Sequence, residues 1–239
     1  MKQQLRISVR DLVEFLERSG DLDSRSGRGG DAKIMQAGSR LHRKIQGRMG
    51  SGYHAEVPLK YRKEWERFSL LIEGRADWVW TEEAFTTIDE IKGTFREVDR
   101  MTEPMRVHLA QARCYAYIYS EQNQLDKAGV RMVYANLETE DVRYFTENWE
   151  WPVLKAWFDD LMERYYRWLS FQADWTEQRE ASLKKLVFPY EYREGQRELA
   201  AGVYRSILRK KRLFIQAPTG VGKTLSALFP ALKAVGEGL

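Results

Sequence analysis

The sequence predicts an α/β fold, with a mixed sheet flanked by helices and a phosphate-binding segment near the C-terminus. Apolar and aromatic residues alternate with a period of two from Tyr53 to Lys92, and strand-like runs return between Val130 and Asn148. Helical patterns precede, separate and follow these strands. The order helix, meander, helix, two strands is typical of an α/β sandwich around a mixed sheet.

The N-terminal part predicts two helices. Ser8 precedes apolar residues at helical spacing, which indicates a capped amphipathic helix that ends at Ser19-Gly20. A Gly-, Ser- and Arg-rich stretch from Ser24 to Gly30 predicts a mobile loop. Ala32 to Arg48 follows as a second helix, on which Gly38, His42 and Gln46 share one ridge.

The meander comprises the segments HAEVPL, FSLLIEGRADWVW and AFTTIDEIK, with Gly74 as a bulge or turn and Glu82-Glu83 as the next turn. Thr102-Glu103-Pro104 then opens a helix to about Gln122, because proline is tolerated in a first turn. Two further strands are expected at Val130–Leu137 and Val142–Asn148.

A long aromatic-rich helix is expected from Pro152 to about Leu186. It either buries its large side chains against the sheet or offers a stacking platform for bases. Phe188-Pro189-Tyr190 marks a boundary, which predicts a first domain over residues 1–187 and a second segment over 188–239. In that segment we expect a helix (Glu194–Lys210), a short strand (Leu213–Gln216), a phosphate loop and a helix from Gly222.

Charge, cysteine content and hydropathy limit the partners and the cellular location that we expect for the protein. The net charge is only +4, but the stretches Asp21–His54 and Arg193–Arg212 each hold seven Lys or Arg residues, against three and two acids. Both basic stretches flank candidate phosphate chemistry. The lone cysteine, Cys114, fits a reducing, cytoplasmic setting. No apolar run is long enough for a membrane span or a signal core, so no membrane partner is expected.

A carboxylate and lysine constellation lies in the meander. Glu90 and Lys92 are two residues apart on one expected strand, so their side chains leave the same face. Asp77, on the adjoining strand, can meet Glu90 across the pair, and the carbonyl of Ile91 adds an oxygen. Hard oxygen ligands beside a lysine suit hydrolysis of a phosphodiester with Mg²⁺ or Mn²⁺. The alternative is that the acidic residue and the lysine form an ordinary cross-strand salt bridge with no catalytic role.

From Ser8 to about Trp149 the residues resemble the RecB-like branch of the PD-(D/E)XK nucleases, which have a restriction-endonuclease-like fold. The GxxD aspartate and ExK glutamate of that family bind Mg²⁺ or Mn²⁺, which the resemblance carries over to Asp77 and Glu90, and its lysine, here Lys92, assists the attacking water. A histidine on an earlier helix, matched by His42, is a further metal ligand in the branch. Its QxxxY motif is matched by Gln111 and Tyr115, one helical turn apart.

Many members of this branch also hold an iron–sulfur cluster on four cysteines. This chain departs from that pattern, because Cys114 is its only cysteine, and we expect no iron–sulfur cluster in this segment. We interpret Cys114 as a small core residue.

The segment from Ala217 to Thr224, APTGVGKT, has the pattern of a phosphate loop. Gly220 and Gly222 allow the backbone amides to surround a phosphate, Lys223 reaches the β/γ-phosphates and Thr224 supplies a hydroxyl for Mg²⁺. The loop resembles that of superfamily 2 helicases. Tyr192-Arg193-Glu194-Gly195-Gln196 resembles the adenine-reading motif of the DinG/XPD-like helicases, which implies that Gln196 and the loop bind ATP. Another kind of P-loop ATPase remains an alternative.

Few residues follow the phosphate loop, so we expect the chain to be the front piece of a longer helicase that completes the ATP site. The resulting hypothesis is a metal-dependent DNA nuclease, acting on single strands or ends, joined to the start of a DinG/XPD-like helicase in DNA repair or processing. The alternatives are an inactive nuclease-like module that binds DNA and loads the helicase, and a chain that acts as an ATPase.

Overall fold

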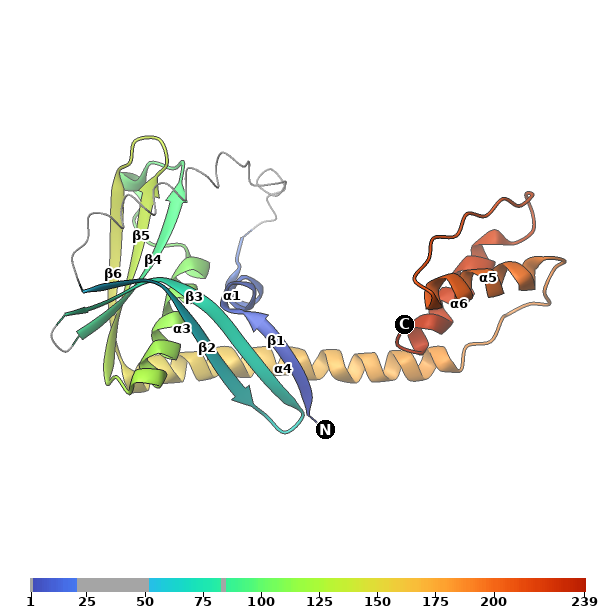
Figure 1. The fold of residues 1–239 in the computed structure, drawn as a ribbon, viewed down its shortest axis with the longest axis horizontal. Helices are drawn as coiled ribbons and strands as arrows, with labels where there is room; N and C mark the ends of the chain where they lie inside the picture. The colour runs from blue at the N-terminus through green and yellow to red at the C-terminus, as the bar shows by residue number, and fades with distance from the viewer. Residues whose placement is uncertain (1, 21–51, 83–84) are drawn as a thin grey trace. The chain divides into compact units, whose positions relative to one another are not determined.

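The computed structural model describes residues 2–20, 52–82 and 85–239 (Figure 1). The chain divides into two compact units, Met1–Tyr165 and Tyr166–Leu239. The expected loop at Ser24–Gly30, the helix at Ala32–Arg48 with its His42, and part of the turn at Glu82-Glu83 lie outside the described residues. The expected domain boundary after residue 187 stays a prediction.

One mixed sheet forms the framework of the first unit (Figure 1). In the described residues its six strands are β1 (Gln3–Ser8), β2 (Tyr53–Glu64), β3 (Phe68–Glu82), β4 (Phe85–Thr94), β5 (Lys127–Asn136) and β6 (Val142–Glu150). β1 lies parallel to β3 and β5 lies parallel to β4, whereas the pairs β2–β3, β3–β4 and β5–β6 are antiparallel. The structure thus has the predicted mixed sheet, with β1 as a strand that the sequence did not predict.

The two edges of β3 are paired differently: one edge has a single partner strand, and the other is shared by two strands. β2 pairs with one edge of β3 from Ser69 to Trp80. Along the other edge, β1 pairs with residues 68–73 and β4 pairs with residues 78–82. In the described part of the chain, residues 74–77 therefore have no strand partner on that edge. This gap separates β1 from β4 and leaves the backbone groups on that edge without the partners of a continuous ladder.

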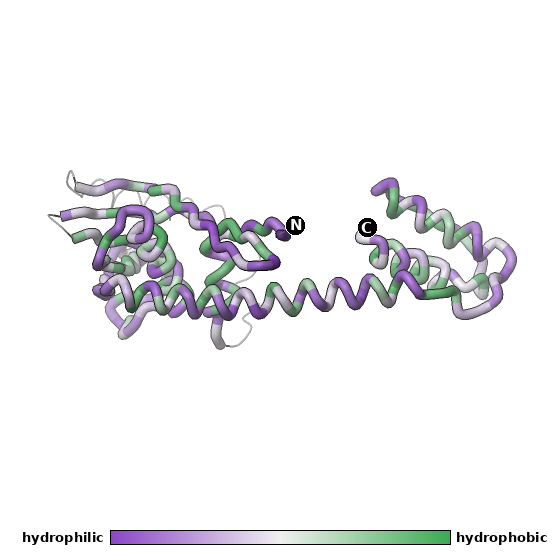
Figure 2. Tube along the Cα trace, turned by 90° about the horizontal axis from the view of Figure 1, so that it is seen from below, coloured by the Kyte–Doolittle hydropathy of each residue, from purple (hydrophilic) through white to green (hydrophobic). Residues whose placement is uncertain are grey.

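Helices α1 (Val9–Glu17) and α3 (Arg106–Asn123), with the first half of α4 (Trp151–Lys184), share one hydrophobic core with the sheet. Ser8 caps α1 as predicted, because its Oγ accepts a hydrogen bond from the Asp11 amide. On α3, the ring of Tyr117 stacks on Phe158 of α4 with 3.9 Å between centroids. The first half of α4 thus packs as a structural helix. Figure 2 shows hydrophilic and hydrophobic residues alternating along α4.

Two expectations about local structure in the first unit were wrong. Gly74 is neither a bulge nor a turn but an interior residue of β3. The helix expected from Thr102 begins only at Arg106, after a short 3₁₀ helix, η2 (Val98–Arg100), and an irregular segment. Met105 is the N-cap of α3, and its amide donates to the Tyr134 hydroxyl at 2.9 Å, which satisfies one of the N–H groups that a helix start leaves without a helical acceptor.

The second unit holds the end of α4, α5 (Gln196–Leu208) and α6 (Lys223–Gly236). The expected strand at Leu213–Gln216 is absent from this described unit. A strand needs a neighbour for its backbone hydrogen bonds, and the described residues of this unit include no other strand. Phe214 is accordingly 91% exposed. On α4, Phe171 and Trp175 are also exposed, so burial does not account for all of its aromatic residues.

Candidate active site

Asp77 lies at the gap between β1 and β4. The β3–β4 ladder ends at the pair Trp78 and Asp89, so the next β4 amide on the side that faces β3, that of Ile91, has no backbone acceptor on β3. Oδ2 of Asp77 accepts a hydrogen bond from this Ile91 amide at 2.8 Å. The side chain of Asp77 therefore replaces a strand partner and is held in place at the site.

Glu90 is buried beside this gap, with 2% of its surface exposed. Its Oε1 accepts a hydrogen bond from Nζ of Lys92 at 2.7 Å. Its Oε2 is also buried and has no hydrogen-bond partner among the described residues. Burial raises the pKa of Glu90 to about 7, because Lys92 and Arg10 only partly offset the loss of solvent and the nearby Asp77 repels a second negative charge.

Helix α3 brings the two residues of the QxxxY pattern to the same place. Nζ of Lys92 also donates to Oε1 of Gln111 at 3.2 Å, and Nε2 of Gln111 donates to the hydroxyl of Tyr115 at 3.2 Å. A Cβ atom on Gly74 would lie 2.7 Å from Cε1 of Tyr115, so the ring occupies the space that a side chain would fill. Glycine is therefore required here by the close approach of Tyr115 to the strand.

These contacts unite five of the expected site residues, namely Asp77, Glu90, Lys92, Gln111 and Tyr115. Ile91 joins them through its backbone. The N–H and C=O groups of one residue point to the same side of a strand, so the Ile91 carbonyl faces the gap with its amide. His42 lies outside the described residues. The contacts described above therefore do not include His42.

The donor set fits a hard divalent cation. Two carboxylates and a backbone carbonyl are the oxygen ligands that Mg²⁺ and Mn²⁺ prefer. The unpartnered Oε2 of Glu90 and the raised pKa of this residue both indicate a position where a positive charge would be stabilising. Within the ranges that the structure describes, no three His, Cys, Asp or Glu side chains form a metal-binding group. The fit therefore rests on Asp77, Glu90 and the Ile91 carbonyl.

The sequence did not single out two residues beside this site, His108 and Arg10. His108 lies three residues before Gln111 on α3, and its Nδ1 is 3.0 Å from the hydroxyl of Tyr134. Arg10 on α1 lies close enough to Glu90 to oppose the rise in its pKa. The helical period of three to four residues groups His108 with Gln111 and Tyr115. No comparable signal in the sequence marks Arg10.

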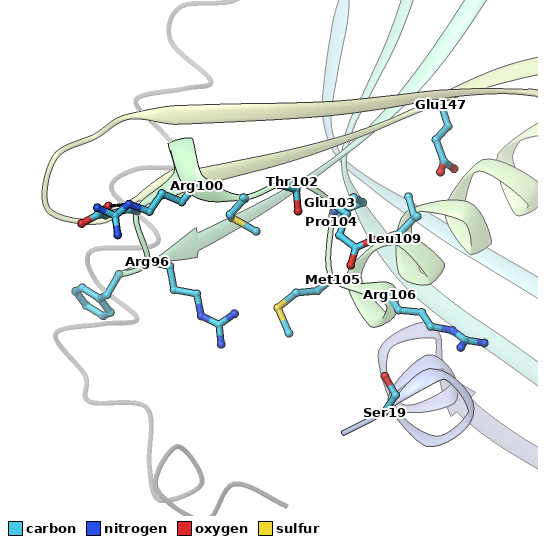
Figure 3. A pocket seen from close by; sticks show the side chains of 13 residues that line it. Ser19, Arg96, Arg100, Thr102, Glu103, Pro104, Met105, Arg106, Leu109 and Glu147 are labelled. Carbon is cyan, nitrogen blue, oxygen red and sulfur yellow. Dashed lines mark ion pairs between the residues drawn. The ribbon is translucent and has the colours of Figure 1, made fainter. Parts of the chain in front are cut away.

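An open cavity of about 1190 Å³ adjoins the start of α3 (Figure 3). The side chains of Arg96 and Met105 extend into the same open space, whereas that of Arg106 extends toward α1. Arg106 and Arg100 pair with carboxylates, those of Glu17 at 2.6 Å and Glu97 at 2.5 Å. Among the described residues, Arg96 is the arginine of this cavity that lacks an ion pair. Exposed Phe95 precedes it.

The predicted phosphate loop of the second unit borders a separate cavity of about 670 Å³, together with Arg193 and Gln196. Gln196 is buried, and its Oε1 accepts from the Arg193 amide at 3.0 Å. Gly220 and Gly222 have φ values of +92° and +79°, which glycine adopts without strain. Nζ of Lys223 donates to the carbonyls of Ala217 and Pro218 at 3.0 and 2.7 Å, within the loop itself.

Helix α6 begins at Lys223, and Thr224 is its second residue. The order of glycines, lysine and hydroxyl at a helix N-terminus is the arrangement in which a phosphate loop holds phosphate and Mg²⁺. Gln196 also contacts this loop, because its Nε2 donates to the Gly222 carbonyl at 3.4 Å. The two motifs of the second unit are therefore adjacent in space.

A comparison of sequences finds similarity over a small part of the chain. A segment of 49 residues, 20% of the chain, is 50% identical to the probable ATP-dependent helicase MJ0942 of Methanocaldococcus jannaschii. The match spans 8% of that helicase, so the chain covers less than a tenth of its relative. No protein-family model matches the chain. The similarity links a small part of the chain to a helicase.

A crystal structure of SSO0001 shares 19% sequence identity with the chain, with a TM-score of 0.45. The alignment covers 68% of this chain and 78% of that one. Within the described residues, no helix combines the length and the apolar character that crossing a bilayer requires.

Proposed function

We propose that the first unit is a metal-dependent DNA nuclease of the RecB-like PD-(D/E)XK kind, which hydrolyses phosphodiester bonds in single strands or at ends. The observation that carries the proposal is the convergence of Asp77, Glu90 and Lys92 at the gap in the sheet. There Glu90 keeps a buried oxygen that has no hydrogen-bond partner within the described ranges. A structural ion pair between Glu90 and Lys92 alone would not require Asp77 to face the same gap.

In this proposal Asp77, Glu90 and the Ile91 carbonyl hold Mg²⁺ or Mn²⁺, with His42 as a further candidate ligand. The cation would lower the pKa of a bound water and stabilise negative charge on the phosphate. Lys92 orients the attacking water or stabilises the transition state, since its ammonium group is held by Glu90 and Gln111. Gln111 and Tyr115 position the strand.

The test is cleavage of labelled single-stranded DNA by the purified chain in the presence of Mn²⁺. Wild type should cleave, and Lys92→Ala should lose about a hundredfold or more in rate, as expected for removing a group that acts in the transition state. Lys60→Ala removes an exposed lysine of β2 and is the matched control. Equal rates for wild type and Lys92→Ala would disprove the assignment.

Calorimetric titration with Mn²⁺ separates this function from an inactive module that only binds DNA and loads the helicase. A nuclease centre should take up Mn²⁺ and lose that binding in Asp77→Ala. An inactive module has no site to lose, so both proteins would give the same titration.

We further propose that the second unit belongs to an ATP-dependent DNA helicase of the DinG/XPD-like kind, whose remaining part completes the ATP site. The 49-residue similarity to a probable ATP-dependent helicase and the adjacency of Gln196 to Gly222 support this. In the longer protein, Gln196, Gly220, Gly222, Lys223 and Thr224 would contact ATP and its Mg²⁺. A filter assay with labelled ATP, comparing the 239-residue chain and the longer protein with their Lys223→Ala variants, tests this.

A further inference from the structure

One face of α3 reaches two neighbouring strands. Gln111 accepts a hydrogen bond from Lys92 on β4, and His108, one turn earlier, contacts Tyr134 on β5. Lys92 and Tyr134 are register partners in the parallel β4–β5 pair, so these two contacts are side by side. The imidazole of His108 therefore lies next to the ammonium group of Lys92 and to the candidate active site.

The hydrogen bonds of Tyr134 determine which nitrogen of His108 carries a proton. Tyr134 is buried, and its hydroxyl oxygen accepts a hydrogen bond from the Met105 amide at 2.9 Å. A buried hydroxyl also needs an acceptor for its own hydrogen. Among the described residues that acceptor is Nδ1 of His108, at 3.0 Å. This assignment leaves Nδ1 unprotonated and places the proton of the neutral ring on Nε2.

The charge around His108 agrees with a neutral ring. Burial, together with the nearby cations Lys92 and Arg10, lowers the pKa of His108 to about 4, against the opposing effect of Glu14. Nε2 has no hydrogen-bond partner among the described residues. The ring therefore presents an N–H donor beside two cations, and an anionic oxygen is the acceptor that this position favours.

We propose that His108 is a strand-binding residue, which donates its Nε2–H to a phosphate oxygen of the DNA strand beside Lys92. The inference rests on the proposed nuclease function and adds to it a contact outside the GxxD, ExK and QxxxY residues. Tyr134 acts on the strand only indirectly, as the positioning residue that keeps Nδ1 unprotonated and directs the proton to Nε2.

Two substitutions separate a strand contact from a structural role. His108→Asn retains an oxygen near the place of Nδ1, so Tyr134 keeps an acceptor, but it removes the donor at Nε2. His108→Gln places an amide donor near Nε2. Binding is measured by fluorescence polarisation with a short labelled oligothymidine in EDTA, where cleavage is absent. We expect His108→Asn to bind about tenfold more weakly, and His108→Gln to bind close to wild type.

Unchanged binding by His108→Asn would overturn the inference, and so would equal losses in both variants, which would indicate structural support alone. Absence of binding by wild type would also overturn it. Nitrogen-15 NMR of the imidazoles adds a readout that needs no substrate, with the His108 signals assigned from their loss in His108→Asn. The spectrum should show an unprotonated Nδ1 and a protonated Nε2, and the reverse pattern would overturn the inference.

Cleavage with Mn²⁺ keeps the two proposals distinguishable. If wild type binds the strand through His108 but neither wild type nor Lys92→Ala cleaves it, the nuclease function fails and the strand contact stands. If wild type cleaves and His108→Asn binds and cleaves as wild type does, the inference about His108 fails alone. Lys60→Asn is the control for loss of binding through an unrelated surface change.

Discussion

Lys92 and Glu90 form an ion pair of 2.7 Å along one face of β4, yet the second carboxylate oxygen of Glu90 has no hydrogen-bond partner in the part of the chain that the structure describes. Burial raises the pKa of Glu90 to about 7, from 4.5 in an unfolded chain. The folded protein thus retains a proton that the unfolded chain releases between these pH values. The stabilisation from this proton is complete below pH 4.5 and is lost as the pH rises through 7.

We therefore expect Glu90→Gln to be more stable than wild type above pH 7 when EDTA excludes divalent cations. The gain should be about 2 kcal/mol at pH 8 and should shrink toward zero as the pH falls to 4.5, because glutamine does not ionise. Urea unfolding of both proteins across this range measures it. A difference that does not change with pH would contradict the assigned environment of Glu90.

Gly74→Ala should disturb the site through Tyr115. The new methyl group would lie 2.7 Å from the ring, which cannot move without leaving Gln111. We expect a loss of about 1–3 kcal/mol, typical of overpacking in a core. Gly202→Ala is the matched control, since its nearest neighbour lies at 3.9 Å and alanine favours helix α5, so it should stabilise by up to about 1 kcal/mol. Thermal unfolding compares the two.

Asp89 and Arg131 form a buried ion pair on the sheet, with Nε and Nη2 of Arg131 at 2.9 and 2.5 Å from the carboxylate. Asp89 is fully buried, so Asp89→Ala leaves an uncompensated charge on Arg131. Removing one partner of a buried pair costs about 3–5 kcal/mol. The exposed pair of Lys2 and Glu64 is the control, and Lys2→Ala should cost less than about 1 kcal/mol. Similar losses in chemical unfolding would show that Asp89 is not the buried member described here.

Arg96 should contribute to DNA binding through its charge. It faces the open cavity beside α3 and has no ion pair among the described residues, so its charge is available to attract a phosphate there. Arg96→Glu should weaken binding of single-stranded DNA and lower the dependence of log affinity on log salt by about one unit or more. Polarisation titrations at several salt concentrations measure both quantities. Lys60→Glu reverses an exposed charge outside the cavity and should change them less.

The sequence predicted those parts of the site that depend on spacing within one element. Glu90 and Lys92 share a strand face, and Gln111 and Tyr115 share a helix face, so both pairs follow from local geometry. The Tyr134–His108 and Asp89–Arg131 contacts join residues on different elements, and no local period predicts which of them meet. The same limit explains β1, because the short segment Gln3–Ser8 contains only two apolar residues and becomes a strand by pairing with β3.

The prediction of a strand at Leu213–Gln216 was wrong because the local pattern favours a strand but a partner strand is missing from the described second unit. The residues have strand-forming character, but strand formation depends on a partner that the described second unit does not contain. Gly74 was misinterpreted because glycine within a strand indicates either a bulge or a close approach, and the Tyr115 ring that decides between them is distant in sequence.

The division of the sheet at β3 also has a consequence for the order of folding. β1 is the first strand of the chain, but it pairs with β3 at positions 3 and 68, so a long loop must close before the pair forms. Helix α1, which carries Arg10, follows β1 directly. Hairpins such as β2–β3 form between neighbouring segments and are favoured early. We therefore expect β1 and α1, with Arg10, to join the candidate site last. A folding intermediate would then hold Asp77 and Glu90 near each other before β1 pairs with β3.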